Sequence, residues 1–202
     1  MTITIVETGL ANIASVRAAF KRLGRQTRLT NDPNEVRQAD RVVLPGVGSF
    51  GAGMTQLNQL DLVEPLRTRI ADDRPTLGIC LGLQLLATQS EESIGVKGLS
   101  CLQTEVKQFP GTVKCPQFGW NWIANENTSV LGEGGYVYYA NSYRLTQCPD
   151  GWSSGWTKYG GDFVGCLQRG SVVACQFHPE LSGAYGSEVI KRWLSLGSKN
   201  VC

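Results

Sequence analysis

Histidine is almost missing from this 202-residue chain, which has a single one, His178, beside seven cysteines. No two cysteines are spaced as C-x-x-C. Zinc sites are typically built from such pairs or from several histidines, so we expect no metal, and no motif indicates another cofactor. The cysteines are instead expected to be mostly free, buried thiols in a protein of the reducing cytoplasm.

An excess of charge is also missing. The formal net charge is +2, and the lysines and arginines form no dense run, so neither nucleic acid nor a membrane surface is an expected partner. The opening MTITIVETGL has no basic segment before a long apolar core, which indicates neither an export signal nor a membrane-spanning helix. We therefore predict a cytoplasmic protein. The length suits one domain over residues 1–202, without internal repeats or a clear linker.

Short apolar segments, glycine-containing turns and helical patterns recur in that order through the first half. Strands are predicted at Ile3 to Val6, Arg41 to Leu44 and 76–80 (TLGIC). Helices are predicted at Ala11 to Leu23 and over 81–89. This order predicts an α/β domain with a largely parallel central sheet and flanking helices.

The second half is richer in strand patterns, which predicts additional antiparallel strands. A last helix is expected from about Ser187 to Leu196, and the strand segments are TEVKQF, YVYYANSY, DFVGCLQ and SVVACQF. Open α/β sheets place their functional sites at the C-terminal ends of strands. The motifs described next follow such predicted ends.

The segment GICLG places Cys80 between two glycines, after a predicted strand and before a predicted helix. It matches G-x-nucleophile-x-G, in which a sharp strand-to-helix turn exposes the central side chain. Gly78 and Gly82 omit side chains that would crowd this turn, and a helix N-terminus favours a thiolate. The plainer alternative is that Cys80 is a small buried apolar residue.

The only histidine follows the strand pattern VVACQF in the segment His178-Pro179-Glu180. Pro179 keeps His178 extended, and residues two apart in an extended chain point to the same side, so Glu180 is expected beside the imidazole. A carboxylate there would orient the ring and stabilise its protonated form. Alone, His178 would more simply be a solvated residue at a strand end. Together with the elbow, it favours a catalytic triad of Cys80, His178 and Glu180.

A third motif, LPGVGSF, places Gly46 and Gly48 on either side of Val47, after a predicted strand. Glycines let the intervening peptides turn their N–H groups toward a developing negative charge, as an oxyanion hole requires. An ordinary strand-to-helix turn is the alternative for this segment.

These motifs together resemble those of class I glutamine amidotransferases. The family's oxyanion loop, nucleophile elbow and His-Glu segment are matched by PGVGSF, LGICLGLQLL and CQFHPELSG. More narrowly, the chain resembles the glutaminase subunits of imidazole glycerol phosphate synthase in the segments ETGLANIASV, SEESIGVKGL, FGWNWI and NSY. The likeness runs almost end to end and implies a single-domain fold of the amidotransferase type.

The resemblance implies hydrolysis of L-glutamine. Cys80 would attack the side-chain amide, His178 would protonate the departing ammonia and then activate water, and Glu180 would orient His178. The family's oxyanion and substrate-binding positions correspond here to Val47, Gly48, Leu81, Gln84, Ser142 and Tyr143. Without the resemblance, Gln84 would be an ordinary polar helix residue.

The resemblance also implies a protein partner, the cyclase subunit of imidazole glycerol phosphate synthase. This (β/α)8 barrel would form a heterodimer with the chain and receive its ammonia. It would make imidazole glycerol phosphate and an aminoimidazole carboxamide ribotide in histidine biosynthesis. Four residues are implied at the interface, although each has a simpler reading as a core or surface residue: Asn12, Ser15, Trp122 and Tyr138.

Two departures from the family pattern keep other functions open. Asn141 and Gln117 stand where the family usually has histidine. A paralogous subunit that serves a different acceptor, such as a sugar-aminating synthase, is therefore an alternative. The intact Cys80, His178 and Glu180 disfavour a non-enzymatic subunit. The H-P-E segment disfavours a thioesterase that shares only the elbow.

Overall fold

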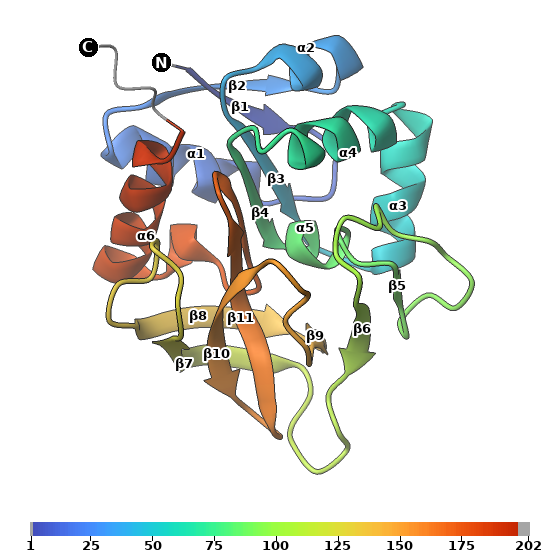
Figure 1. The fold of residues 1–202 in the computed structure, drawn as a ribbon, viewed down its shortest axis with the longest axis vertical. Coiled ribbons are helices and arrows are strands. Elements are labelled where there is room, and N and C mark those ends of the chain that lie inside the picture. The colour runs from blue at the N-terminus through green and yellow to red at the C-terminus, as the bar shows by residue number, and fades with distance from the viewer. Residues whose placement is uncertain (1, 198–202) are drawn as a thin grey trace.

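Five parallel strands form one half of the central sheet in this computed structural model, which describes residues 2–197 (Figure 1). Strands β3 and β4 are neighbours, and Gly46 at the end of β3 pairs with Cys80 at the end of β4. The glycine loop and the cysteine elbow therefore emerge side by side. In spatial order, the strands are β2 (Gln26–Thr30), β1 (Thr2–Val6), β3 (Val42–Gly46), β4 (Thr76–Cys80) and β12 (Val172–Cys175).

Four antiparallel strands continue the same sheet from β12. They are β11 (Asp162–Arg169), β10 (Ser153–Lys158), β7 (Gln117–Asn125) and β8 (Gly135–Asn141). A separate small sheet contains β5 (Gln89–Ser90), β6 (Glu105–Gln108) and β9 (Tyr143–Leu145). The predicted α/β architecture, with flanking helices and additional antiparallel strands, is confirmed. The large sheet is mixed, because its second half is antiparallel.

Helices cover both faces of the parallel half. Two helices pack on one face, α1 (Ile13–Arg22) and α6 (Gly183–Ser195), and three on the other, α2 (Pro33–Gln38), α3 (Phe50–Gln59) and α4 (Val63–Ala71). Strand side chains alternate between the two cores: Val43 packs with α1 and α6, whereas Val42 and Leu44 face the other helices. Burial on both faces explains why β3, β4 and β12 are almost continuous apolar runs.

The helix after the elbow is much shorter than the sequence indicates. Helix α5 (Leu81–Gln84) ends after one turn, so the predicted helix over 81–89 is wrong in its second half. The backbone carbonyls of residues 85–87 accept hydrogen bonds from the amides of residues 99–102 instead. One turn carries little helix dipole, so side chains must supply most of the stabilisation of a thiolate at this elbow.

Other differences come from tertiary contacts. The last helix begins at Gly183, ahead of the predicted Ser187, and YVYYANSY is divided between β8 and β9. Strand β7 was not among the predicted strands, and its faces are unusual: its aromatic side chains are exposed, whereas Gln117 faces inward. The sequence patterns also did not indicate β2, β10, α2, α3 and α4. Within residues 2–197, no helix is both long and apolar enough to span a bilayer.

Candidate active site

A pocket of about 370 Å³ opens at the carboxyl ends of β3 and β4. Parallel strands end at one edge of a sheet, where open α/β folds place their sites. Glu180 does not line the pocket but lies behind His178. The other eight residues predicted as catalytic, oxyanion or substrate-binding all line it: Val47, Gly48, Cys80, Leu81, Gln84, Ser142, Tyr143 and His178.

Cys80 ends β4 with φ 54° and ψ −109°, a backbone conformation that residues other than glycine rarely adopt. The turn is possible because Gly82 follows: a Cβ atom there would overlap the carbonyl oxygen of Leu44. A Cβ atom at Gly78 would lie 3.1 Å from the carbonyl oxygen of Gly82, which is tight but less severe. The predicted elbow is present, and Gly82 is the residue that its packing against β3 requires.

His178 and Glu180 are in contact as predicted, but not through an extended backbone. The Nδ1 atom of His178 lies 2.8 Å from Oε1 of Glu180, and both side chains are buried. His178 is extended, whereas Pro179–Leu181 forms a 3-10 turn that brings the carboxylate to the ring. The expected alternation along an extended chain is therefore wrong, because proline starts a turn here instead of continuing the strand.

Strand β8 holds the turn that carries His178. The backbone N–H of His178 donates to the carbonyl oxygen of Tyr138 at 2.9 Å, and the N–H of Tyr138 donates to Oγ of Ser182 at 2.9 Å. The Ser182 hydroxyl in turn donates to the carbonyl oxygen of His178 at 2.6 Å. These bonds hold the backbone on both sides of the imidazole, so its position depends on β8 as well as on β12.

The surroundings of His178 favour its charged form. Burial by itself lowers the pKa of the imidazole, but hydrogen bonds with Cys80 and Glu180 and their negative charges outweigh burial and raise the pKa of His178 to about 10. A protonated ring favours a thiolate on its neighbour. The arrangement can therefore hold an imidazolium beside the Cys80 sulfur near neutral pH.

Two further groups contact that sulfur. The Nε2 atom of Gln176 lies 3.7 Å from Sγ of Cys80, and the carbonyl oxygen of Ala140 lies 3.9 Å from it. The Oε1 atom of Gln176 accepts a hydrogen bond from Gln84 at 3.0 Å. Sequence reasoning missed Gln176, although it stands in the same strand-end segment as His178.

The predicted oxyanion loop lies beside the elbow but is not fully directed at it. Gly48 has φ 97°, a left-handed conformation that glycine adopts readily. The backbone N–H of Val47 donates to the carbonyl oxygen of Leu10 at 2.7 Å, so it is already used within the protein. Val47 therefore lines the pocket as predicted, but its N–H does not serve as an oxyanion donor in this conformation.

With this geometry in place, comparison with known proteins identifies the family. The family model described as glutamine amidotransferase class-I matches residues 4–195. The chain belongs to the class I glutamine amidotransferases. The match includes the elbow, the glycine loop and the His178 turn within one continuous region.

Several relatives of this amidotransferase share about two fifths of its sequence. The imidazole glycerol phosphate synthase subunits HisH of Moorella thermoacetica and Bacillus cereus (strain G9842) are 40% and 39% identical over 195 residues, 95% of this chain and 93% of each relative. Imidazole glycerol phosphate synthase hisHF, chloroplastic, of Arabidopsis thaliana is 38% identical over 199 residues. That match covers 95% of this chain and 34% of the relative, so the chain spans about a third of the Arabidopsis protein.

Solved structures show that the amidotransferase fold is shared more widely. A crystal structure of a glutamine amidotransferase superposes with a TM-score of 0.76 at 17% identity, and covers 95% of this chain and 96% of that one. The structure of PurLQS from Thermotoga maritima gives a TM-score of 0.75 at 16% identity, with 96% and 97% covered. At such identities, the likeness concerns the fold alone.

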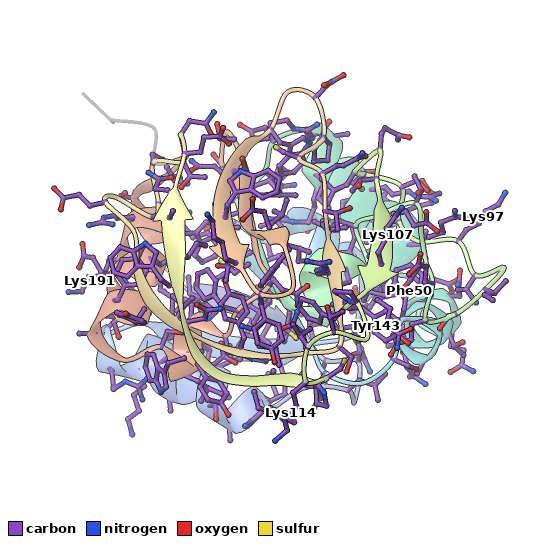
Figure 2. All side chains as sticks on the ribbon, turned by 90° about the horizontal axis from the view of Figure 1, so that it is seen from below. Phe50, Lys97, Lys107, Lys114, Tyr143 and Lys191 are labelled. Carbon is purple, nitrogen blue, oxygen red and sulfur yellow. The ribbon has the colours of Figure 1, made fainter. Side chains whose placement is uncertain are left out.

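The amidotransferase pocket contains an acid that sequence reasoning missed. Glu92 lines the pocket, and its Oε2 accepts a hydrogen bond from the backbone N–H of Phe50 at 2.6 Å. Burial, and then the charge of Glu92, raise the pKa of Tyr143, so its hydroxyl stays neutral and can donate. Figure 2 shows Tyr143 nearer the middle of the view, with Lys97 and Lys191 at the outline.

Glu92 is the only carboxylate among the residues that line the amidotransferase pocket, and no lysine or arginine lines it. Such a pocket attracts positive charge at one end. Within residues 2–197, no three His, Cys, Asp or Glu side chains gather where they could hold a metal ion.

The two departures from the family pattern are neighbours in this amidotransferase. Gln117 on β7 pairs directly with Asn141 on β8, and both are buried. Asn141 lines the pocket, and its Nδ2 donates to the carbonyl oxygen of Tyr143 at 3.0 Å. The same carbonyl accepts from Gln84 at 3.1 Å. Position 141 thus belongs to the hydrogen-bonded wall of the pocket.

The predicted interface residues of the amidotransferase lie in two places. Oδ1 of Asn12 accepts from the backbone N–H of Ser15 at 3.2 Å, so Asn12 also caps α1. Trp122 and Tyr138 belong to an aromatic surface on the outer face of β7 and β8, made of Phe118, Trp120, Trp122, Tyr136 and Tyr138. Phe118 is 70% exposed and also lines the pocket, so this aromatic surface is continuous with its mouth.

Proposed function

We propose that this chain is a glutaminase that hydrolyses L-glutamine to glutamate and ammonia through a cysteine thioester. The observation that carries the proposal is the arrangement at the elbow. Cys80 lies beside His178, whose Nδ1 is 2.8 Å from Glu180, and the pair opens into a pocket. Membership in the amidotransferase family supports the same chemistry.

The reaction needs a nucleophile, an acid and a base in turn. The Cys80 thiolate attacks the carboxamide carbon, and the C–N bond breaks as the His178 imidazolium gives its proton to the leaving nitrogen. The neutral imidazole then takes a proton from water, whose oxygen attacks the thioester. The C–S bond breaks, which restores the thiolate beside the imidazolium, and the product loses its carboxyl proton to solvent as glutamate. Glu180 keeps Nδ1 protonated, so Nε2 is the atom that exchanges the proton.

The amino-acid end of glutamine carries an ammonium and a carboxylate, and the far side of the pocket suits both. Glu92 attracts the ammonium. Ser142 and Tyr143 lie nearby and supply a hydroxyl each for the carboxylate. Gln84 contributes only its oxygen to the pocket, because its NH2 group is already used by Tyr143 and Gln176.

The ammonia passes, under this proposal, to a (β/α)8 cyclase subunit held as a heterodimer, which makes imidazole glycerol phosphate in histidine biosynthesis. Relatives named as HisH subunits at about two fifths identity support the partner. The aromatic surface supports a docking site, because exposed aromatic clusters next to a pocket are typical of interfaces. Trp122 and Tyr138 would lie within it.

Activation by the partner follows from the glycine loop. The Val47 N–H must leave the Leu10 carbonyl before it can stabilise an oxyanion. Leu10 lies just before Asn12 and Ser15 in the chain, so a partner that docks there can loosen this bond. The chain alone is then a slow glutaminase, because loss of one oxyanion donor typically costs about 10²–10³ in rate.

The test is to measure glutamate release by the chain alone, with the cyclase, and with the cyclase bound to its nucleotide substrate. We expect a 1:1 complex by size-exclusion chromatography, and the last condition to be about 10²–10³ times faster than the first. Absence of glutamate release under all three conditions would disprove a glutaminase. An isolated chain as fast as the full complex would disprove the activation step.

A paralogous role with another acceptor remains the second candidate, and the Gln117–Asn141 pair is the observation behind it. Both positions differ from the family pattern and are buried, and Asn141 lines the pocket. Purification of the native complex distinguishes the two candidates. Recovery of a sugar-aminating synthase in place of the cyclase would favour the paralogue.

A further inference from the structure

A chain of three side-chain amides leads to the sulfur of Cys80. Asn141 and Gln84 both donate to the carbonyl oxygen of Tyr143, at 3.0 and 3.1 Å. Gln84 also donates to Oε1 of Gln176 at 3.0 Å, and Nε2 of Gln176 lies 3.7 Å from Sγ of Cys80. Gln176 is fully buried, so water does not compete for its amide.

The backbone carbonyl of Tyr143 determines the orientation of the Gln84 amide, and Gln84 in turn determines that of Gln176. A backbone carbonyl can only accept, so the NH2 group of Gln84 must face Tyr143. The second hydrogen of that group then points to Gln176, which must present its oxygen. The NH2 group of Gln176 is thereby left on the side of the sulfur. Rotation of the Gln176 amide would place its oxygen against the sulfur and its NH2 group against that of Gln84.

We propose that Gln176 is a catalytic residue that stabilises the Cys80 thiolate by donating a hydrogen bond to its sulfur, and that Gln84 positions it. The inference deepens the proposed glutaminase function and rests on Cys80 as its nucleophile. It also gives Gln84 a different task from direct recognition of glutamine, since its two donors are already used.

The elbow needs such a donor. Helix α5 has a single turn and offers little dipole to the sulfur. On another side, the carbonyl oxygen of Ala140 lies 3.9 Å from Sγ, where it accepts from a thiol but repels a thiolate. Cys80 is 7% exposed, so solvent can supply few donors. An amide N–H aimed at the sulfur favours the ionised form over the neutral one.

A buried glutamine could also be merely a satisfied core residue, and the chain contains a matched control. Gln168 is 8% exposed, and its Oε1 accepts from the backbone N–H groups of Ser129 and Val130 at 2.8 and 3.3 Å. Its Nε2 donates to the Ser129 hydroxyl at 2.7 Å. Gln168 makes at least as many hydrogen bonds as Gln176, but its partners are Ser129, Val130 and Gly170 and not Cys80.

The experiment measures how fast iodoacetamide alkylates Cys80 as a function of pH, with peptide mapping to assign the modified cysteine. The thiolate displaces iodide, so the rate reports ionisation and needs neither glutamine nor a partner. We expect Gln176→Leu to slow alkylation about tenfold at neutral pH and to move the pH profile upward, since hydrogen bonds to charged groups are the strong ones. Gln84→Met should act in the same direction but less strongly, and Gln168→Leu should leave the profile unchanged.

Circular dichroism and thermal unfolding establish that each variant is folded. Should Gln176→Leu fail to fold, Gln84→Met tests the same amide chain from its outer end. An unchanged Cys80 profile in the folded variants overturns the proposal, as does an equal shift in Gln168→Leu. Failure of the proposed glutaminase function would look different. Gln176→Leu would still change the pH profile of Cys80 alkylation, but the unaltered chain with its partner would release no glutamate.

Discussion

Cys80 and the pair Cys166–Cys175 are buried thiols in the same sheet with very different surroundings. Cys166 and Cys175 face each other across β11 and β12 with their sulfurs 3.8 Å apart, and both are fully buried in the apolar core. Burial, and then the neighbouring Cys166, raise the pKa of Cys175 well above its ordinary value. Cys80 is almost as buried but lies beside an imidazole and an amide donor.

The comparison shows that burial does not decide the reactivity of a thiol in this protein. A thiolate in an apolar core has no charge partner, so burial keeps the thiol protonated and inert. Near His178, a comparable degree of burial strengthens the attraction between thiolate and imidazolium, because little water screens it. The polar neighbours, which come from distant parts of the chain, make the difference.

The largest expected effect is the loss of the nucleophile. Cys80→Ser should lower glutamate release by the complex by about 10³-fold or more, because a serine hydroxyl is not ionised by this imidazole. Cys166→Ala should keep the rate. A glutamine-analogue electrophile should label Cys80 and spare the other cysteines. Peptide mapping that finds the label mainly on Cys166 or Cys175 would contradict the conclusion that Cys80 is the reactive thiol.

The next largest effect concerns the partner of the thiolate. His178→Ala should lower glutamine-dependent synthesis by about 10²–10⁴-fold, because the single imidazole is then lost as acid and base. Synthesis from added ammonia should be unchanged, since only the glutaminase step uses His178. Glu180→Gln keeps the ring and should cost less. Glutamine-dependent turnover at the original rate in His178→Ala would contradict this role.

A smaller effect is expected on the titration of His178, which NMR can follow without overlap because the chain has one histidine. The ring should stay protonated from pH 6 to 9, since its pKa is raised to about 10. Cys80→Ala removes one of the groups that raise it, so the midpoint should fall toward the ordinary value of about 6.5. Cys166→Ala should not move the midpoint. A ring that is already neutral at pH 7.5 in the unaltered chain would contradict the ion pair.

The smallest expected effect concerns Asn141 in the wall around Cys80. An amide does not titrate, so activation by the partner should show no pH step that depends on position 141. Asn141→His should introduce a modest step, of about a few-fold, near the ordinary histidine pKa of about 6.5. The measurement is the ratio of glutaminase rates with and without the ligand-bound cyclase between pH 5.5 and 8.5. Asn141→Gln serves as the control without a titrating group, and a step of equal size in that variant would exclude titration as its cause.

Local patterns in the sequence were enough to predict much of the fold and the catalytic residues at the centre of the candidate site. Apolar runs indicated β1, β3, β4 and β12 because strands buried on both faces leave a continuous apolar signature. The elbow was readable because both glycines stand within two residues of Cys80, although Gly82 is required by its contact with Leu44 on β3. His178 stood out because it is the only histidine, and Glu180 because it follows at short range.

The prediction was weaker where long-range contacts replace local preference. Helix α5 stops early because residues 99–102 take its next carbonyls. The aromatic face of β7 points outward, against the usual rule for an apolar pattern. Glu92 reaches the pocket from the loop after β5, and no spacing in the sequence indicates this.

The sequence by itself determined which groups can react: a cysteine at a glycine-flanked turn, and one histidine with a carboxylate close behind it. Only the tertiary structure decided how those groups are oriented. Gln176 and Gln84 are far apart in the chain, yet their amides meet beside Cys80, and the Val47 N–H turns to Leu10 instead of the pocket. Hydrogen-bond direction depends on where a distant donor or acceptor finally lies, and a local pattern of residues does not carry that information.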